Sequence, residues 1–363
     1  MLSCLSPNGS TLVAGDALPD HLVVATLEGL VTAARDGNGF RVVARALTDR
    51  HVSSLWYEPS ADLLFAASYQ GGIFASADGG LTFASLGSAL EHRNVYCVAA
   101  RTTAEGLVLY AGTEPVGLFV STDRGATWRE LSGIAEMPNR EHWTFPGPPH
   151  EAHLKNFTFV PDDDAHLFAS VEQGGLFESR DGGVSFRELE SIELRDDEWY
   201  RDVHRMVLRP GDPSTMFFSG GDGLATSTDG GRTWRRVLPT TYEIGYPDGL
   251  VVHPGDPDLM FVSGAHRQPG TWRESHSAHA HVARSTDGGS TWSLLSGGLP
   301  EPLDANIEAL SLAVTPIADE LYLGTTDGDV YLSRNRGDSF DLVLSGLAPI
   351  SKGGHYRGLV RTA

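Results

Sequence analysis

The chain has 363 residues and a formal net charge of −20, from 47 acidic and 27 basic side chains. This acidity argues against nucleic acid and anionic membranes as partners, because both are bound by clustered lysine and arginine. Hydrophobic residues make up 40% of the chain, with 42 glycines and 20 prolines, which is typical of many short strands joined by tight turns. Only Lys155 and Lys352 are lysines, so arginine carries nearly all of the positive charge.

The N-terminal segment, MLSCLSPNGSTLVAGDALPD, has no basic region and no long apolar run, so we expect no signal peptide. No segment approaches the roughly 20 apolar residues that a membrane helix needs. The two cysteines, Cys4 and Cys97, cannot build a disulfide framework and fit a reducing compartment. These features predict a cytoplasmic protein, and they leave its oligomeric state open.

An eight-residue phrase, Ser-x-Asp-x-Gly-x-Thr-Trp, recurs along the chain and dominates its organisation. Six copies begin at Ser76, Ser121, Ser179, Ser227, Ser285 and Ser333, and a shorter relative occupies residues 34–40. Successive starts lie 42 to 58 residues apart, a period that predicts a propeller or a similar array. In each copy the carboxylate can accept backbone N–H groups across a hairpin, the glycine supplies a positive φ, and the final aromatic can pack between units. Asn335 replaces the aspartate in the last copy.

Each repeat is predicted to form a blade of four strands, A to D from the centre outward, with the phrase at the turn between C and D. The second repeat shows the pattern, with its strands at residues 51–59, 63–68, 71–76 and 83–88. The predicted blades, in chain order, are residues 21–47 with 355–363, 51–88, 93–132, 153–190, 202–238, 246–296 and 306–345.

The first repeat lacks an A strand ahead of residues 21–47. The C-terminal segment HYRGLVRTA, residues 355–363, matches the A-strand pattern. We therefore predict a single all-β domain, a seven-bladed β-propeller whose C-terminal strand completes blade 1 and removes open sheet edges.

The phrase is the Asp-box, and over nearly its whole length the chain resembles the BNR/Asp-box repeat propellers. That architecture is shared by sialidases, xyloglucan-cleaving glycosidases, the luminal domain of sortilin-type receptors and photosystem II assembly factors. The resemblance implies the fold. It does not choose a function, because the box is a structural turn found in enzymes and non-enzymes alike.

The strand order predicts that the boxes and any ligand site lie on opposite faces. If strand A runs from top to bottom, the D-to-A and B-to-C loops lie on top and the boxes beneath. Three long insertions, at residues 137–153, 192–202 and 265–281, would all rise on the top face, where loops on a rigid scaffold usually carry function. The box aspartates are therefore interpreted as structural.

Alternate residues of the A strands are expected to line one central funnel, with a charged mouth and an apolar floor. The first ring comprises His51, Arg93, His153, Asp202, Tyr246, Glu308 and His355. The second comprises Ser53, Val95, Lys155, His204, Asp248, Leu310 and Arg357. The third, apolar ring comprises Leu55, Cys97, Phe157, Met206, Leu250, Leu312 and Leu359.

The first two rings suggest a divalent transition metal, because imidazoles from separate strands can converge on one ion. The predicted metal ligands are His51, His153, His204 and His355. Asp202, Asp248 or Glu308 would add a ligand or orient one. The alternative is a set of solvated polar groups around a water-filled channel. A further run of His276, His279 and His281 is either a second metal site or an exposed lid.

The carboxylates also allow glycosidase chemistry. Asp202, Asp248 and Glu308 could supply a general acid and a base or nucleophile, with Arg357 and Tyr246 as further catalytic candidates. Aromatic residues on the long loops could stack on sugar rings: Trp143, Trp199, Tyr200 and Trp272. A sialidase would need an arginine triad beside a tyrosine nucleophile. Arg93, Arg201 and Arg357 could imitate the triad, with Tyr246 as the nucleophile, but no early arginine motif of that type is present.

The preferred hypothesis is an enzyme that binds a small or saccharide-like molecule in the funnel and carries out metal-assisted hydrolysis or lyase chemistry. One alternative is a non-catalytic binding or assembly scaffold. A second is a carboxylate-based glycoside hydrolase.

Overall fold

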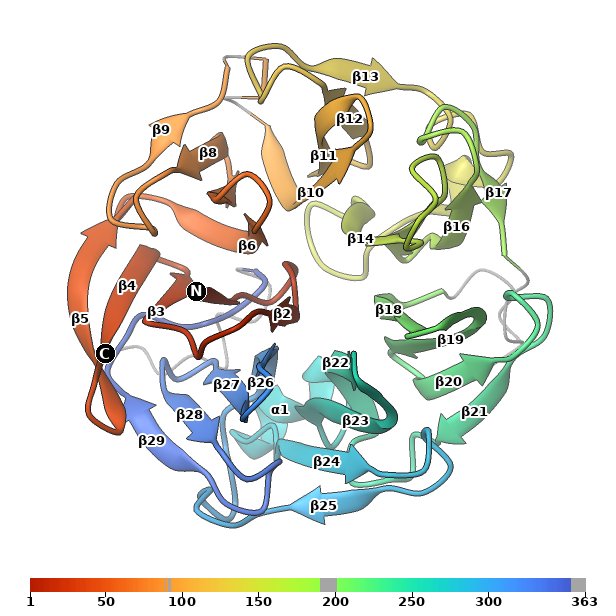
Figure 1. The fold of residues 1–363 in the computed structure, drawn as a ribbon. Helices are drawn as coiled ribbons and strands as arrows, with labels where there is room; N and C mark the ends of the chain where they lie inside the picture. Colours follow the sequence, from red (N-terminus) through yellow and green to blue (C-terminus); the bar gives the residue numbers. More distant parts are fainter. Residues whose placement is uncertain (88, 91–92, 190–200, 354–363) are drawn as a thin grey trace.

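The computed structural model describes residues 1–87, 89–90, 93–189 and 201–353. In this part of the chain the strands form seven sheets, six with four strands and one with five. The sheets are arranged in a ring around a central axis (Figure 1). The predicted all-β, seven-bladed propeller is therefore confirmed.

Successive strands along the chain build successive blades, except that β2 belongs to blade 7. Blade 1 contains β1 (Leu2–Leu5), β3 (His21–Thr26), β4 (Gly29–Asp36) and β5 (Gly39–Ala46). Blade 2 contains β6 (His51–Glu58), β7 (Leu63–Tyr69), β8 (Gly72–Ser76) and β9 (Ala84–Ser85). Blade 3 contains β10 (Asn94–Thr103), β11 (Gly106–Glu114), β12 (Leu118–Ser121) and β13 (Arg129–Leu131). Blade 4 contains β14 (His153–Phe159), β15 (Leu167–Glu172), β16 (Gly175–Ser179) and β17 (Arg187–Glu188).

The remaining blades repeat this order. Blade 5 contains β18 (Val203–Arg209), β19 (Asp212–Gly220), β20 (Gly223–Ser227) and β21 (Arg235–Leu238). Blade 6 contains β22 (Tyr246–His253), β23 (Asp256–Ala265), β24 (His281–Ser285) and β25 (Ser293–Leu295). Blade 7 contains β2 (Leu12–Ala14), β26 (Ile307–Val314), β27 (Asp319–Thr325), β28 (Val330–Ser333) and β29 (Asp341–Leu344). A 3-10 turn, η1 (Arg140–His142), and a helix, α1 (Pro269–Ser275), lie in two of the long insertions. No helix in the described ranges has the length and apolar character needed to cross a membrane.

The N-terminal segment occupies the centre of the ring, and this corrects the predicted closure. β1 pairs in parallel with β3, and β2 pairs in parallel with β26 of blade 7. The inner place beside β3, predicted for the C-terminal segment, is therefore taken by β1; residues 355–363 lie outside the described residues. The prediction failed because β1 has only four residues, and its partner, β3, lies beyond the turn and β2.

Between β1 and β2 the chain turns across the channel. The backbone N–H groups of Asn8 and Ser10 donate to the carbonyls of Ser53 and Leu55 in β6, the innermost strand of blade 2. From blade 5, the buried Arg205 guanidinium donates to the carbonyls of Pro7 and Gly9, at 2.9 Å each. The protein's own N-terminal turn thus lies in the channel at the level of Ser53, Leu55 and Arg205. The residues of the predicted apolar floor pack between the blades instead.

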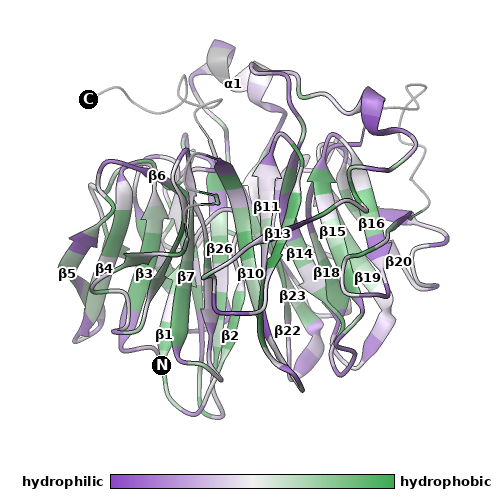
Figure 2. Ribbon diagram, turned by 90° about the horizontal axis from the view of Figure 1, so that it is seen from above, coloured by the Kyte–Doolittle hydropathy of each residue, from purple (hydrophilic) through white to green (hydrophobic). Residues whose placement is uncertain are grey.

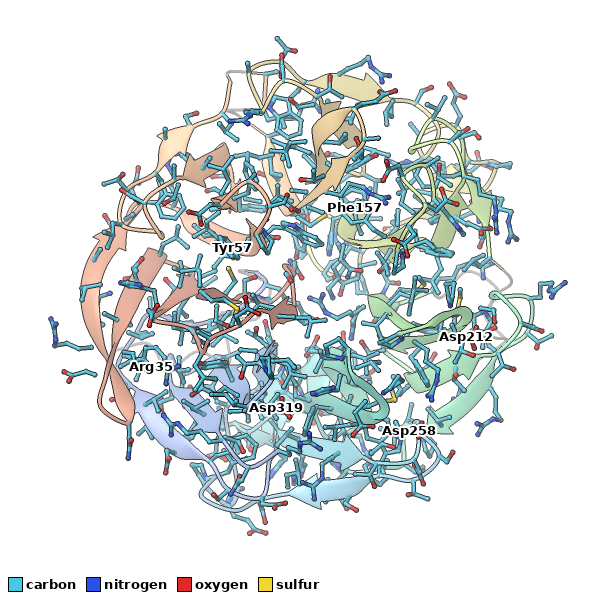
Figure 3. The ribbon with its side chains drawn as sticks, viewed as in Figure 1. Arg35, Tyr57, Phe157, Asp212, Asp258 and Asp319 are labelled. Atoms are coloured by element: carbon cyan, nitrogen blue, oxygen red, sulfur yellow. The ribbon has the colours of Figure 1, made fainter. Side chains whose placement is uncertain are left out.

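Blades 7 and 1 are joined by polar and apolar contacts. Arg35 of blade 1, which is labelled in Figure 3, donates to both carboxylate oxygens of Glu320 in blade 7, at 3.0 and 2.7 Å. Leu5 of β1 is fully buried in a cluster with Tyr322 and Ile350 from the blade 7 side. The N-terminal strand therefore contributes core to the interface that closes the ring.

Each of the seven interfaces between neighbouring blades contains one hydrophobic cluster. The described members of the predicted third ring belong to these clusters: Leu55, Cys97, Phe157, Met206, Leu250 and Leu312. The final aromatic of each repeated phrase packs at the interface with the preceding blade, as predicted: Phe83, Trp128, Phe186, Trp234, Trp292 and Phe340.

The repeated phrases form tight turns between the third and fourth strands. In the fourth copy Ser227 donates to Asp229 at 2.8 Å, and the Thr233 N–H donates to the same carboxylate at 2.9 Å. Hydrogen bonds from the Thr233 hydroxyl and N–H lower the pKa of Asp229 to about 2. In the last copy the amide of Asn335 accepts from the Ser339 N–H and donates to the Ser339 hydroxyl, both at 2.9 Å, which preserves the turn without a charge.

The two faces of the ring differ in their loops (Figure 2). The helix α1 stands clear of the strands at one face, and the N-terminus lies toward the other. We call the face that carries α1 the top. The turns that hold the repeated phrases follow the third strands at the opposite end.

Candidate functional site

Six inner strands carry a β-bulge at equivalent places. In β6, β10, β14, β18, β22 and β26 the ladder skips one residue near the start of the strand. The skipped residues are Ser53, Tyr96, Lys155, His204, Asp248 and Glu308. A bulge re-aims the side chain of the extra residue and interrupts the two-residue alternation.

The predicted second ring is wrong in blades 3 and 7. Val95 and Leu310, assigned to that ring, are buried in interblade clusters. Tyr96 and Glu308 hold the equivalent places in their blades. In blades 2, 4, 5 and 6 the bulged residue lies six positions before a proline that follows the strand, but in blade 7 it lies eight positions before the proline, and blade 3 has no such proline. An alignment counted back from that proline therefore slips in blades 3 and 7.

Around the bulges the inner strands and their neighbours form a buried ionic network, which we call the central cluster. All its members have 8% or less of their surface exposed. They are Glu114, His153, Lys155, Glu172, Asp202, His204, Tyr246, Asp248, Asn306, Glu308 and Lys352. Both lysines of the chain therefore belong to it.

His153 lies between two carboxylates. Its Nδ1 is 3.2 Å from Glu114 Oε2, and its Nε2 is 2.6 Å from Glu172 Oε2. Burial by itself would lower the pKa of His153, but the charge of Glu172 and hydrogen bonds to both carboxylates outweigh it and raise the pKa. The ring stacks on Tyr96 with a centroid distance of 3.8 Å. Both ring nitrogens of His153 thus face carboxylates, and the ring links Glu114 to Glu172.

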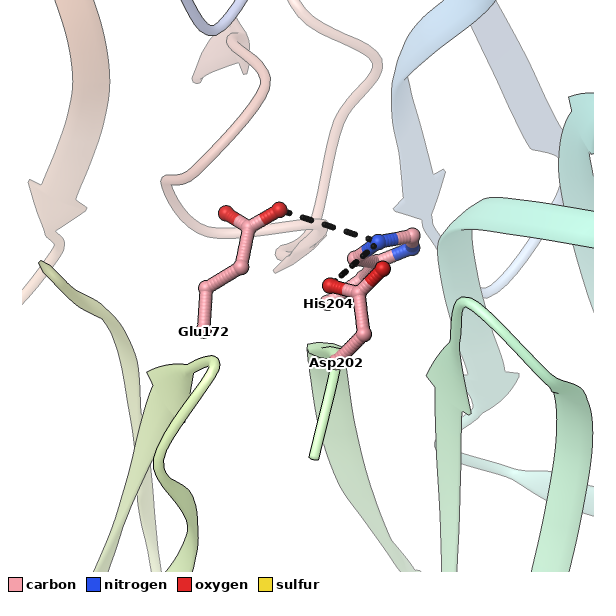
Figure 4. Close-up of side chains that lie close together, drawn as sticks. All are labelled: Glu172, Asp202 and His204. Carbon is pink, nitrogen blue, oxygen red and sulfur yellow. Dashed lines mark ion pairs between the residues drawn. The ribbon is translucent and has the colours of Figure 1, made fainter. Parts of the chain in front are cut away.

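Glu172, Asp202 and His204 form a compact triad in which one donor atom from each lies within 4.8 Å of the others (Figure 4). His204 Nε2 is 3.2 Å from Asp202 Oδ1 and 3.7 Å from Glu172 Oε1. The other nitrogen, Nδ1, lies 2.7 Å from the carbonyl oxygen of Pro247. Because a carbonyl only accepts, Nδ1 carries the proton of a neutral ring, and the Nε2 lone pair then faces two carboxylates.

Such a convergence of electron-rich atoms requires a positive charge between them, either a proton on Nε2 or a metal ion. Glu172 Oε1 and His204 Nε2 are buried and make no hydrogen bond to the described residues. The other oxygen of Glu172, Oε2, lies 3.0 Å from Lys155 Nζ and also contacts His153. Oε1 is therefore left facing His204. The pKa of Lys155 is lowered to about 8, and burial is the main cause. An imidazole anchored through Nδ1, with two carboxylates, is a donor set that fits a divalent transition metal.

A second group of charges lies on the Nδ1 side of His204. Lys352 Nζ contacts Asp248 Oδ1, and the Lys352 backbone N–H donates to Glu308 at 2.8 Å. Asn306 donates to Asp248 at 2.8 Å. Burial tends to raise the pKa of Asp248, but the charges of Lys352 and His204 bring it below its usual value. The pKa of Glu308 is raised, by burial first and then by the charge of Asp248. Two carboxyls with opposite shifts can act as proton acceptor and proton donor.

The structure places the other predicted site residues as follows. Tyr246 donates to Asp202 at 3.2 Å and belongs to the central cluster. His51 contacts the carbonyl of Ser351 through Nε2 at 3.1 Å, so it lies beside the cluster and not in the triad. His355 and Arg357 lie outside the described residues. Of the four predicted metal histidines, His204 is in the triad and His153 adjoins it.

The residues suggested for sugar recognition have other partners where they are described. Arg93 lies 4.9 Å from the centre of the Phe119 ring, and Arg201 pairs with Glu188 at 3.1 Å. Trp143 and Trp272 are buried, with 7% and 1% of their surface exposed. Trp143 belongs to the cluster between blades 3 and 4, and Trp272 packs in a small cluster with Tyr246. Trp199 and Tyr200 lie outside the described residues. No arginine triad and no open tryptophan face is formed by the described members of these sets.

The sequence reasoning missed Glu114 and Glu172, the last residues of β11 and β15. Each ends an apolar B strand, and Glu172 pairs across the ladder with His153. A charged residue at the end of an otherwise apolar strand was the sequence signal that could have identified both glutamates. Lys352 was also missed, although the scarcity of lysine marks it in the sequence.

No protein-family model matches the chain, and no curated protein matches it. Among solved structures, an ancestral GH74 enzyme superposes with a TM-score of 0.62 at 18% identity, over 81% of this chain and 38% of that one. The GH74 xyloglucanase from Xanthomonas campestris gives a TM-score of 0.62 at 17% identity, over 94% of this chain and 55% of that one. YCF48 bound to a D1 peptide gives 0.56 at 14% identity, over 91% and 94% of the two chains.

These likenesses establish the seven-bladed fold and not a family, because identity stays below one fifth. The chain spans only about two fifths to just over half of the GH74 enzymes that it matches. The neighbours include glycoside hydrolases and a peptide-bound protein, so the fold is compatible with catalysis and with binding.

Proposed function

We propose that the central cluster is the active site of an enzyme that acts on a small polar or saccharide-like molecule with the help of a divalent transition metal. The observation that carries this proposal is the buried triad of Glu172, Asp202 and His204, whose donor atoms lie within 4.8 Å of one another. Buried groups of this kind are costly unless a cation compensates them.

The residues divide into two sets with His204 between them. On the Nε2 side, the triad would hold the ion, while Lys155 and His153 fix the far oxygen of Glu172. A divalent ion at this place would polarise a substrate oxygen or lower the pKa of bound water. On the Nδ1 side, Asp248 would take a proton and Glu308 would give one, a division that the lowered pKa of Asp248 and the raised pKa of Glu308 favour. Hydrolysis and lyase chemistry both use such a pair.

The test is the metal content of the purified protein after expression in metal-supplemented medium. We expect close to one ion per chain, and a lower melting temperature after treatment with a chelator. His204→Gln should remove the ion and the chelator effect. His253→Gln is the matched control, because His253 is also buried and paired with a carboxylate, Asp319, at 3.3 Å, but it lies outside the central cluster.

Less than about 0.2 ions per chain, with a melting temperature that the chelator leaves unchanged, would rule out the metal-dependent function. Equal metal content in the two histidine variants would place the ion elsewhere in the protein.

A glycoside hydrolase without a metal is the second candidate. It is favoured by the divergent pKa shifts of Asp248 and Glu308 and by the fold of the GH74 neighbours. Under this hypothesis a panel of glycosides is cleaved by the metal-free protein, and Glu308→Gln abolishes cleavage. If neither metal nor hydrolysis is found, and a thermal-shift screen with peptides gives a hit instead, the protein is a binding scaffold.

A further inference from the structure

The two carboxylates of the triad are each held by a neighbour outside the triad (Figure 4). Glu172 has its Oε2 oxygen 2.6 Å from His153 Nε2, while its Oε1 oxygen lies 3.7 Å from His204 Nε2. Asp202 accepts from the Tyr246 hydroxyl through Oδ2 at 3.2 Å, while its Oδ1 oxygen lies 3.2 Å from the same nitrogen of His204. In both side chains one oxygen is therefore fixed by a neighbour, and the other faces the imidazole.

The support of Glu172 continues outward through blades 3 and 2. His153 Nδ1 lies 3.2 Å from Oε2 of Glu114, the last residue of β11. The other oxygen of Glu114 accepts from the Tyr69 hydroxyl at 2.7 Å and from the Asn94 amide at 3.3 Å. Glu114 and His153 expose 3% of their surface or less, so little solvent competes for these contacts. A line of polar contacts thus runs from Tyr69 of blade 2 to Glu172 of blade 4.

The support of Asp202 comes from blade 6. Tyr246 is the first residue of β22 and exposes 5% of its surface. Its ring packs edge-on against Trp272, in the insertion that contains α1, with 6.1 Å between the ring centres, and against His204 with 4.6 Å. These two contacts restrict the ring and keep its hydroxyl at Asp202.

We propose that Glu114 and Tyr246 are positioning residues of the metal site proposed above. Glu114 acts on Glu172 through His153. Tyr246 acts on Asp202 directly. Groups that orient metal ligands by hydrogen bonds typically contribute about 10- to 100-fold to metal affinity, because a ligand left to rotate must be ordered when the ion binds. This inference rests on the function proposed for the central cluster.

The test is a titration of the full-length, metal-stripped protein with Co²⁺, followed by calorimetry and by the visible absorption of the bound ion. Glu114→Gln and Tyr246→Phe should each weaken binding by about tenfold. Each should also change the absorption bands, which report the arrangement of the ligands around the ion. His204→Gln gives the baseline without the triad.

The matched controls are Glu178→Gln and Tyr110→Phe. Glu178 is also a buried glutamate beside a histidine, His166, at 2.8 Å. Tyr110 is also a buried tyrosine, and its hydroxyl donates to the Gly182 carbonyl at 3.4 Å. Neither control residue belongs to the central cluster. We expect both controls to keep the affinity and the absorption bands of the wild type, whatever their melting temperatures.

A second measurement needs no metal. The proton magnetic resonance spectrum of the metal-free protein should contain a downfield imidazole N–H resonance from His153 that Glu114→Gln shifts and Glu178→Gln leaves in place. The role of either residue is overturned if its variant binds Co²⁺ as tightly as the wild type, with the same absorption bands. If the wild type itself binds no Co²⁺, the proposed metal function fails and the role of Tyr246 fails with it. The His153 resonance then decides the role of Glu114: a shift in Glu114→Gln supports it, and an unchanged resonance overturns it.

Discussion

The role of the N-terminal strand in closing the ring can be tested with Leu5→Ala. Leu5 is fully buried between blades 1 and 7, in a cluster with Tyr322 and Ile350. A Cβ added at Gly324 would lie 3.0 Å from both Leu5 and Ile350, so the site is tightly packed. Removing the side chain leaves a cavity, and fully buried leucines cost about 2–5 kcal/mol on such truncation.

The expected shift in melting temperature follows from the size of the chain. An unfolding entropy of about 2.1 cal/mol/K per residue gives roughly 0.8 kcal/mol/K for 363 residues. A loss of 2–5 kcal/mol therefore lowers the melting temperature by roughly 3–7 °C. Differential scanning calorimetry measures this directly.

The matched control is Leu12→Ala, on β2 of the same segment. Leu12 has 36% of its surface exposed, so its truncation should cost less than about 0.5 kcal/mol and move the melting temperature by under about 1 °C. If Leu5→Ala shifts the melting temperature no more than Leu12→Ala does, the N-terminal strand does not carry the closure of the ring.

Three further predictions concern the turns, the lysines and the N-terminal plug. Asp229→Asn should lower stability at neutral pH. Because the pKa of Asp229 in the folded protein is depressed to about 2, the difference in stability from wild type should vanish as the pH falls through the usual aspartate range toward 2. Urea midpoints measure this difference, and a difference that does not change with pH would refute the role of the charge. Lys155 and Lys352 each expose only 2% of their surface. An acylating reagent should therefore label neither lysine in the native protein and both in denaturant. Labelling of the native protein, detected by peptide mass spectrometry, would contradict their burial. Arg205→Met leaves two carbonyls of the N-terminal turn without donors and should cost about 1–3 kcal/mol in urea unfolding, and an unchanged midpoint would show that the guanidinium does not hold the turn.

The sequence by itself determined the architecture. Each repeated phrase is a local turn whose serine, aspartate and threonine contact one another within eight residues, so its geometry follows from the chain alone, and its aromatic marks the next interface. The period then determines the blade type, and the count of seven follows. The inner strands and several of their polar residues, among them Asp202, His204 and Asp248, were predictable for the same reason.

Only the tertiary structure decided how the ring closes and which polar groups meet. β1 is short and joins a strand beyond its own neighbour in the chain, so no local pattern favoured it over the C-terminal segment. The bulged residue does not lie at a fixed distance from the end of its strand, so a count along the sequence misplaced Tyr96 and Glu308. Glu172 and His204 come from different blades, and their distance depends on how the blades pack. Contacts across blades are set by packing, and the one-dimensional pattern does not record them.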